Sequence, residues 1–112
     1  MAAGIYNIII DQGSDWAEEF TVKDNGVARD LTGYSARAQM RAKSSSTSIV
    51  GTFVCTLPDA ANGVVKMALG NAASSAIAPG TYDYDLEIYT VGDASVTRLL
   101  GGKVTLTPET TK

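Results

Sequence analysis

Apolar and polar side chains alternate with a period of two residues along this chain, and that spacing is typical of a β-strand with one buried face. The alternation is clearest in Tyr34–Arg41 and Tyr82–Tyr89. In the second segment the side chains on the apolar face are Tyr82, Tyr84, Leu86 and Ile88. Because a strand places successive side chains on opposite faces, each segment is expected to cover a core on one side only.

Six further segments combine β-prone residues with flanking turn signals. They are Ile5–Asp11, Trp16–Lys23, Ile49–Thr56, Val64–Leu69, Ser95–Leu100 and Lys103–Thr107. The separators contain pairs of residues that suit tight turns, namely Asn25-Gly26, Asn62-Gly63, Gly92-Asp93 and Gly101-Gly102. Short strands at this spacing predict an all-β fold, a sandwich or a barrel of about seven or eight strands.

The 112 residues are expected to form one domain, residues 1–112. One segment departs from the β pattern: the alanine-rich Asn71–Ala78 predicts a short helical turn, which Asn71 could cap and which ends before Pro79-Gly80. The polar run Lys43–Ser48 predicts a mobile loop, and residues 107–112 a flexible tail.

The composition removes several classes of function. The chain has no histidine and a single cysteine, Cys55, which excludes Ser-His and Cys-His dyads, the usual zinc sites and an internal disulfide. A net charge of −3 disfavours nucleic-acid binding, which needs clustered cations. No run approaches the roughly 20 apolar residues of a membrane span, and nothing resembles a targeting segment. The sequence therefore predicts a protein made in the cytoplasm, with no enzymatic activity, cofactor, metal, nucleic acid or membrane partner.

A row of acids, Asp83, Asp85 and Glu87, is the strongest candidate for chemistry. Residues two apart on a strand lie roughly 6.6 Å apart, close to the carboxylate separation of an inverting glycosidase. On an open sheet face, however, all three acids can ionise, and pairing with the outward Arg37 and Arg41 is the simpler expectation. Calcium binding by Asp83, Asp85 and Asp93 stays open, although no EF-hand pattern is present.

Cys55 shares strand parity with Ile49 and Phe53, which predicts a small buried hydrophobe rather than a nucleophile. Trp16 and Phe20 also share a strand face and are expected in the core. The alternative is that they anchor an interface, where tryptophan is enriched.

Several segments resemble one known family when they are taken together. These segments are Ala3–Asn7, Asp11–Gly13, Asp30–Arg37, Gly80–Glu87 and Arg98–Glu109. They are similar to small β-sandwich proteins encoded among the structural genes of tailed bacteriophages and prophages. The Leu-Thr-Gly-Tyr element at 31–34 and the Tyr-Asp-Leu element at 84–86 are similar to those of N-terminal domains in phage baseplate and receptor-binding assemblies. The resemblance implies an immunoglobulin-like antiparallel β-sandwich and carries over no catalytic residues.

The resemblance implies a non-enzymatic virion structural protein, a tail or baseplate adaptor or a fibre-attachment module. Its partners would be other virion proteins and further copies of itself, because many modest contacts add up in a symmetric particle. A capsid cement or decoration protein is the alternative within this class. A carbohydrate-binding module and a hydrolase that uses the acidic row are the alternatives from other classes.

Exposed strand edges are the expected docking elements, since they offer unpaired N–H and C=O groups. The apolar N-terminal segment Ala2–Ile10 is the preferred interface, with an ordinary covered strand as the equal alternative. The interface residues predicted from the sequence are Ile5, Tyr6, Ile8, Ile10, Trp16 and Tyr89.

Overall fold

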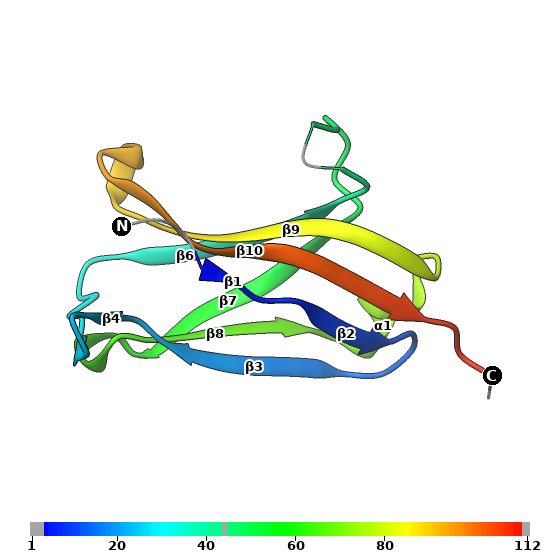
Figure 1. The fold of residues 1–112 in the computed structure, drawn as a ribbon, viewed down its shortest axis with the longest axis horizontal. Coiled ribbons are helices and arrows are strands. Elements are labelled where there is room, and N and C mark those ends of the chain that lie inside the picture. The colour runs from blue at the N-terminus through cyan, green and yellow to red at the C-terminus, as the bar shows by residue number, and fades with distance from the viewer. Residues whose placement is uncertain (1–3, 44, 111–112) are drawn as a thin grey trace.

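The chain forms an all-β, sandwich-like fold, as predicted (Figure 1). A computed structural model describes residues 4–43 and 45–110. Its strands are β1 (Gly4–Ile5), β2 (Ile8–Asp11), β3 (Trp16–Thr21), β4 (Lys23–Asp24), β5 (Val27–Ala28), β6 (Ser35–Arg41), β7 (Gly51–Asp59), β8 (Val64–Leu69), β9 (Gly80–Tyr89) and β10 (Val96–Thr107). Its helical turns are η1 (Ala60–Asn62), α1 (Asn71–Ser75) and η2 (Val91–Asp93).

Eight strands form one sheet that folds into two layers at β7. The strand order is β1-β10-β9-β6-β7-β8-β3, and β2 pairs with β10 beyond β1. The start of β7 pairs with β6, up to Phe53 opposite Ala38, and from Val54 onward it pairs with β8. Strand β7 therefore belongs to both layers, with β6, β9 and β10 on one side and β8 and β3 on the other (Figure 1).

The core fills the space between the layers with the alternate, inward-facing side chains of most strands. Tyr84, Leu86 and Ile88 of β9 are buried, as the alternation predicted. The complete buried apolar set is Ile8, Ile10, Leu31, Ala38, Met40, Phe53, Val65, Met67, Leu69, Ile77, Tyr84, Leu86, Ile88, Val104 and Leu106. Phe53 joins the two layers, because its ring makes edge contacts with Trp16 of β3 and Tyr84 of β9.

The N-terminal strand departs from a purely antiparallel sandwich. Both β1 and β2 pair in parallel with β10, which places the first strand of the chain beside the last. The chain then crosses at residues 12–15 into the other layer, where β3 pairs antiparallel with β8. This crossing leaves β1 and β2 at one margin of the sheet and β3 at the other.

Three sequence-based boundaries differ from the structure. Gly101-Gly102 is not a turn, because it lies inside the continuous strand β10. Ile49 lies outside β7 and is 48% exposed, so it does not share a strand face with Cys55. The segment Trp16–Lys23 divides into β3 and β4.

The remaining turns and the short helix confirm the local signals. Asn25 and Gly26 take positive φ angles of 51° and 79° between β4 and β5. Helix α1 forms where alanine predicted it, but Gly70 rather than Asn71 is its N-cap. The Asp15 carboxylate caps the start of the helix instead, because it accepts a hydrogen bond from the Asn71 backbone N–H at 2.7 Å. This N–H has no partner within the helix.

The predicted tail is partly tied to the fold. Thr107 ends β10, and the Glu109 backbone N–H donates to the Gln12 side-chain oxygen at 3.2 Å. Residues 111–112 of that tail, Ser44 of the predicted loop, and Ala2 of the predicted interface lie outside the described residues. Within the described ranges, no helix is long and apolar enough to cross a lipid bilayer.

Candidate interaction edge

The segment Gly4–Asp11, here called the N-terminal edge, forms one margin of the larger layer. It comprises β1, β2 and the two residues between them, and within residues 4–43 and 45–110 it pairs with β10 alone. The Tyr6 backbone N–H donates to the Gly101 oxygen at 3.0 Å, and the Gln12 backbone N–H donates to the Thr107 oxygen at 3.0 Å. In a parallel strand pair, only every second residue of a strand directs its backbone N–H and C=O groups to the same neighbouring strand. The N–H and C=O groups of Ile5, Asn7 and Ile9 therefore point to the open side.

The side chains of this edge alternate between the core and solvent. Ile8 and Ile10 are 3% and 1% exposed and belong to the core, so their assignment to an interface was wrong. Ile5 and Ile9 point outward and are 86% and 70% exposed. Ile9 was missed from the sequence, because the run Ile8–Ile10 has no polar side chain that marks which isoleucines face outward.

Tyr6 and Asn7 explain why the edge divides into β1 and β2. The Tyr84 hydroxyl donates to the Tyr6 backbone oxygen at 2.5 Å, so this carbonyl bonds to a side chain instead of the β10 backbone. In place of the Tyr6 carbonyl, the Asn7 side-chain oxygen accepts from the Lys103 backbone N–H of β10, at 3.0 Å. Burial raises the pKa of Tyr84 to about 12, so this hydroxyl keeps its proton at neutral pH.

Gly102 is the residue of β10 that lets the N-terminal edge come this close. A Cβ atom at Gly102 would lie 2.6 Å from the Tyr6 backbone oxygen and 2.8 Å from the Asn7 side-chain oxygen. Both distances are far below van der Waals contact. The glycine pair read as a turn is therefore a docking surface for the first strand of the chain.

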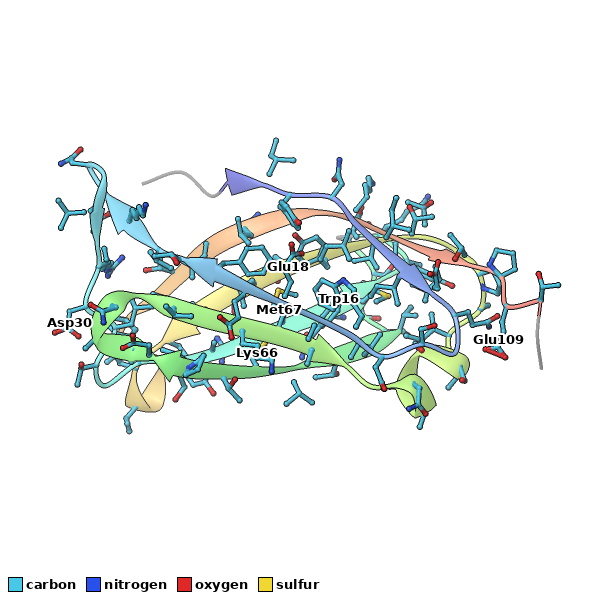
Figure 2. All side chains as sticks on the ribbon, turned by 90° about the horizontal axis from the view of Figure 1, so that it is seen from below. Trp16, Glu18, Asp30, Lys66, Met67 and Glu109 are labelled. Atoms are coloured by element: carbon cyan, nitrogen blue, oxygen red, sulfur yellow. The ribbon has the colours of Figure 1, made fainter. Side chains whose placement is uncertain are left out.

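Tyr6 also links this edge to the opposite layer. Its hydroxyl donates to the Glu18 carboxylate of β3 at 2.6 Å, and its ring meets the Phe20 ring edge-on at 5.2 Å. The hydrogen bond to Glu18 raises the pKa of Tyr6. Half-buried Trp16 lies on the same face of β3 as Glu18 (Figure 2). It packs against Phe53 and the core, so of the two predicted roles the contacts support the core one.

Strand β3 is the second open margin, and it is chemically different. In the described part of the chain it pairs with β8 alone. It carries two adjacent acids, Glu18 and Glu19, and Glu19 lies opposite Lys66 of β8. Charged residues on an edge strand disfavour pairing with an identical strand.

The acidic row lies on the outer face of β9 between two basic strands. Glu87 forms the predicted ion pair with Arg37 at 2.9 Å, and Asp83 pairs with Lys103 of β10. Asp85 lies opposite two residues without charge, Gly101 and Gln39. Burial, and secondly the neighbouring Glu87, raise the pKa of Asp85. Among the described residues no group of three or more His, Cys, Asp or Glu side chains is placed to hold a metal ion.

Replacing Asp85 by asparagine is expected to stabilise the protein at neutral pH. Because the pKa of Asp85 is higher in the folded protein than its ordinary value of 3.8, ionisation of this carboxyl opposes folding. The cost is absent in acid below that value and grows as the pH rises through the pKa of the folded state. Urea unfolding of Asp85→Asn and wild type at acidic and neutral pH measures the difference.

Asp83→Asn is the matched control, since it removes the ion pair with Lys103 and is expected to bring no gain in stability. A loss of stability in Asp85→Asn at neutral pH would contradict the assignment.

The two remaining candidate residues, Tyr89 and Cys55, both pack against other parts of the protein. The Arg37 guanidinium lies 4.4 Å from the centre of the Tyr89 ring, so a cation already covers one face of this aromatic residue. Cys55 is half-buried beside the core, and burial raises the pKa of its thiol to about 11. At neutral pH this thiol is protonated and a poor nucleophile.

Comparison with known proteins adds no identification: no model of a protein family matches the chain, and no curated protein matches it.

Proposed function

We propose that this chain is a non-enzymatic structural protein that works through protein–protein contacts at its N-terminal edge. One observation carries the proposal: an uncharged strand margin, Gly4–Ile10, presents unpaired backbone groups together with the exposed Ile5 and Ile9. Exposed edges of this kind are ordinarily shielded by charge, proline or a covering element. An edge left bare is suited to receive another chain.

The chemistry of the other candidates supports a non-enzymatic role. Asp83 and Glu87 are ion-paired, and the row lies on the outer face of the sheet rather than in an enclosed site. A glycosidase needs one acid held neutral against an ionised partner in a closed site. The Cys55 thiol lacks activation, since its pKa is raised rather than lowered.

The place of work that we propose is the virion of a tailed phage, as a tail or baseplate adaptor or a fibre-attachment module. The support is the resemblance of Asp30–Arg37, Gly80–Glu87 and the closing segment to small phage sandwich proteins, together with an edge built for contact. A compact sandwich repeated in many copies can hold an assembly together through contacts that are individually modest. Capsid decoration is the alternative location for the same contact edge.

A carbohydrate-binding role is less well supported. Sugar-binding modules stack their ligands on open aromatic faces, whereas one face of Tyr89 is covered by Arg37. The two most exposed large side chains of the N-terminal edge, Ile5 and Ile9, are aliphatic and offer no aromatic face on which a sugar could stack.

The proposed location in the virion can be tested on purified particles of a phage that encodes this protein. Mass spectrometry is expected to find the protein in the particles, and immunogold labelling is expected to place it on the tail or baseplate. Label on the head would favour decoration instead. Absence from washed particles would contradict every structural version of the proposal.

An edge variant connects the location to the contact surface. Ile9→Lys introduces a charge on the exposed face of the edge and is expected to reduce incorporation into particles. Val54→Lys, at a site 66% exposed on β7, introduces the same charge elsewhere and is expected to be incorporated normally.

A further inference from the structure

We infer that two copies of the chain pair through their N-terminal edges, antiparallel, about a two-fold axis at Asn7. The inference rests on the proposed function only in using the same edge, and it adds the partner and the register. In this arrangement Ile5 of one copy lies opposite the partner's Ile9, and the two Asn7 residues face each other.

The backbone groups on the open side match this register. The Tyr6 and Gln12 backbone N–H groups donate to β10, and β1 and β2 keep the same register with β10. The alternation of a parallel pair therefore directs the N–H and C=O groups of Ile5, Asn7 and Ile9 away from β10. In an antiparallel ladder every second pair of opposite residues exchanges two hydrogen bonds, and the pairs between have none. A two-fold axis at Asn7 makes residues 5, 7 and 9 the hydrogen-bonded set. The open backbone groups of these three residues then find partners in the second copy.

The side chains select this register among those that the backbone allows. Ile5 and Ile9 lie on the outer face, are four residues apart and are the two most exposed large apolar side chains of the edge. An axis at Asn7 places Ile5 opposite the partner's Ile9 and Ile9 opposite the partner's Ile5, so the four isoleucines form two cross-strand pairs, one on each side of the paired Asn7 residues. An axis at Ile5 or at Ile9 would match only one isoleucine pair and leave the remaining two in solvent.

Charge favours a second copy on this edge and disfavours it on the other. From Gly4 to Ile10 the edge has no charged residue, so two copies meet without repulsion. On β3 a symmetric pairing centred between Glu18 and Glu19 would place acids opposite acids, which is destabilising. A two-fold contact is also closed, so it covers the exposed edge of both copies and stops at the dimer.

Sedimentation velocity of the purified full chain over a wide range of concentration tests the pairing. Wild type is expected to show a reversible monomer–dimer equilibrium. Ile9→Glu is expected to raise the dissociation constant at least about tenfold, because burial of the isoleucine is lost and two carboxylates enter the contact. Val54→Glu carries the same charge on the other layer and is expected to dimerise as wild type does.

A charge exchange tests the register itself. Ile5→Lys alone is expected to weaken the dimer, and the double variant Ile5→Lys/Ile9→Glu is expected to recover much of the loss, since residue 5 meets residue 9 of the partner. An axis at Ile5 or Ile9 would place like charges together and give no recovery. Circular dichroism checks that each variant is folded, which is expected because both side chains are exposed in the monomer.

Three results would overturn the inference. They are a monomer at all concentrations, a dimer unaffected by Ile9→Glu, and an open series of higher oligomers. These outcomes are separate from the location in the virion, because the assay uses the isolated chain. A dimer that is absent from particles would contradict the proposed function and leave the pairing intact.

Discussion

Replacing Phe53 by alanine is expected to lower the free energy of unfolding by about 3–5 kcal/mol, the range for truncation of a buried aromatic residue. The Phe53 side chain is 4% exposed at the point where β7 passes from one layer to the other. Its ring lies 5.7 Å from that of Trp16 and 6.2 Å from that of Tyr84. The substitution therefore leaves a cavity and removes the aromatic contact between the layers.

Urea unfolding followed by tryptophan fluorescence measures this change, because Trp16 is the single tryptophan and touches Phe53. Val54→Ala, on the opposite face of the same strand, is the control and is expected to change stability by no more than about 0.5 kcal/mol. Equal losses in the two variants would mean that the layers are not joined at Phe53.

Gly102→Ala is expected to destabilise the protein by about 1–3 kcal/mol and to loosen the N-terminal edge, as an overpacked contact does. The added methyl group would press on the Tyr6 backbone oxygen, which accepts from the Tyr84 hydroxyl of β9, and on the Asn7 side-chain oxygen, which accepts from the Lys103 backbone N–H of β10. Hydrogen exchange should report the loosening as faster exchange at Tyr6, whose N–H bonds to Gly101.

Gly101→Ala is a matched control one residue away. The nearest atom to a Cβ at Gly101 is the Tyr84 backbone oxygen, at an ordinary contact distance of 3.5 Å. This variant is expected to be neutral or slightly stabilising, since alanine is favoured over glycine within a strand. A Gly102→Ala variant as stable as Gly101→Ala would show that the edge can shift without cost.

Much of the sandwich could be predicted because its strands cover a core with one face. The alternation in Tyr34–Arg41 and Tyr82–Tyr89 set both the strands and the inward side chains, and the ion pair between Arg37 and Glu87 followed from their outward positions. Gly101-Gly102 could not be interpreted in the same way. Two glycines have the same local signature in a turn and in a strand that accepts a close neighbour, and that neighbour lies at the other end of the chain.

The N-terminal edge was found as a segment but not residue by residue. In the run Ile8–Ile10 no polar side chain marks the outward face, so the local pattern does not say which isoleucines are buried. The answer depends on the pairing of β2 with β10, which is a contact across the whole chain. The hydrogen bond from the Tyr84 hydroxyl to the Tyr6 backbone oxygen, next to β1, likewise joins distant parts of the chain, so no local sequence pattern predicts it.

The parallel pairing of the first and last strands also determines how the molecule responds to tension. Strand β1 begins toward one end of the long axis, and β10 finishes at the other (Figure 1). Pulling on the two ends of the chain would slide these strands lengthwise past each other, so their hydrogen bonds would share the load instead of opening one after another. A block connected in series between two parts of a larger machine would thus yield only at high force.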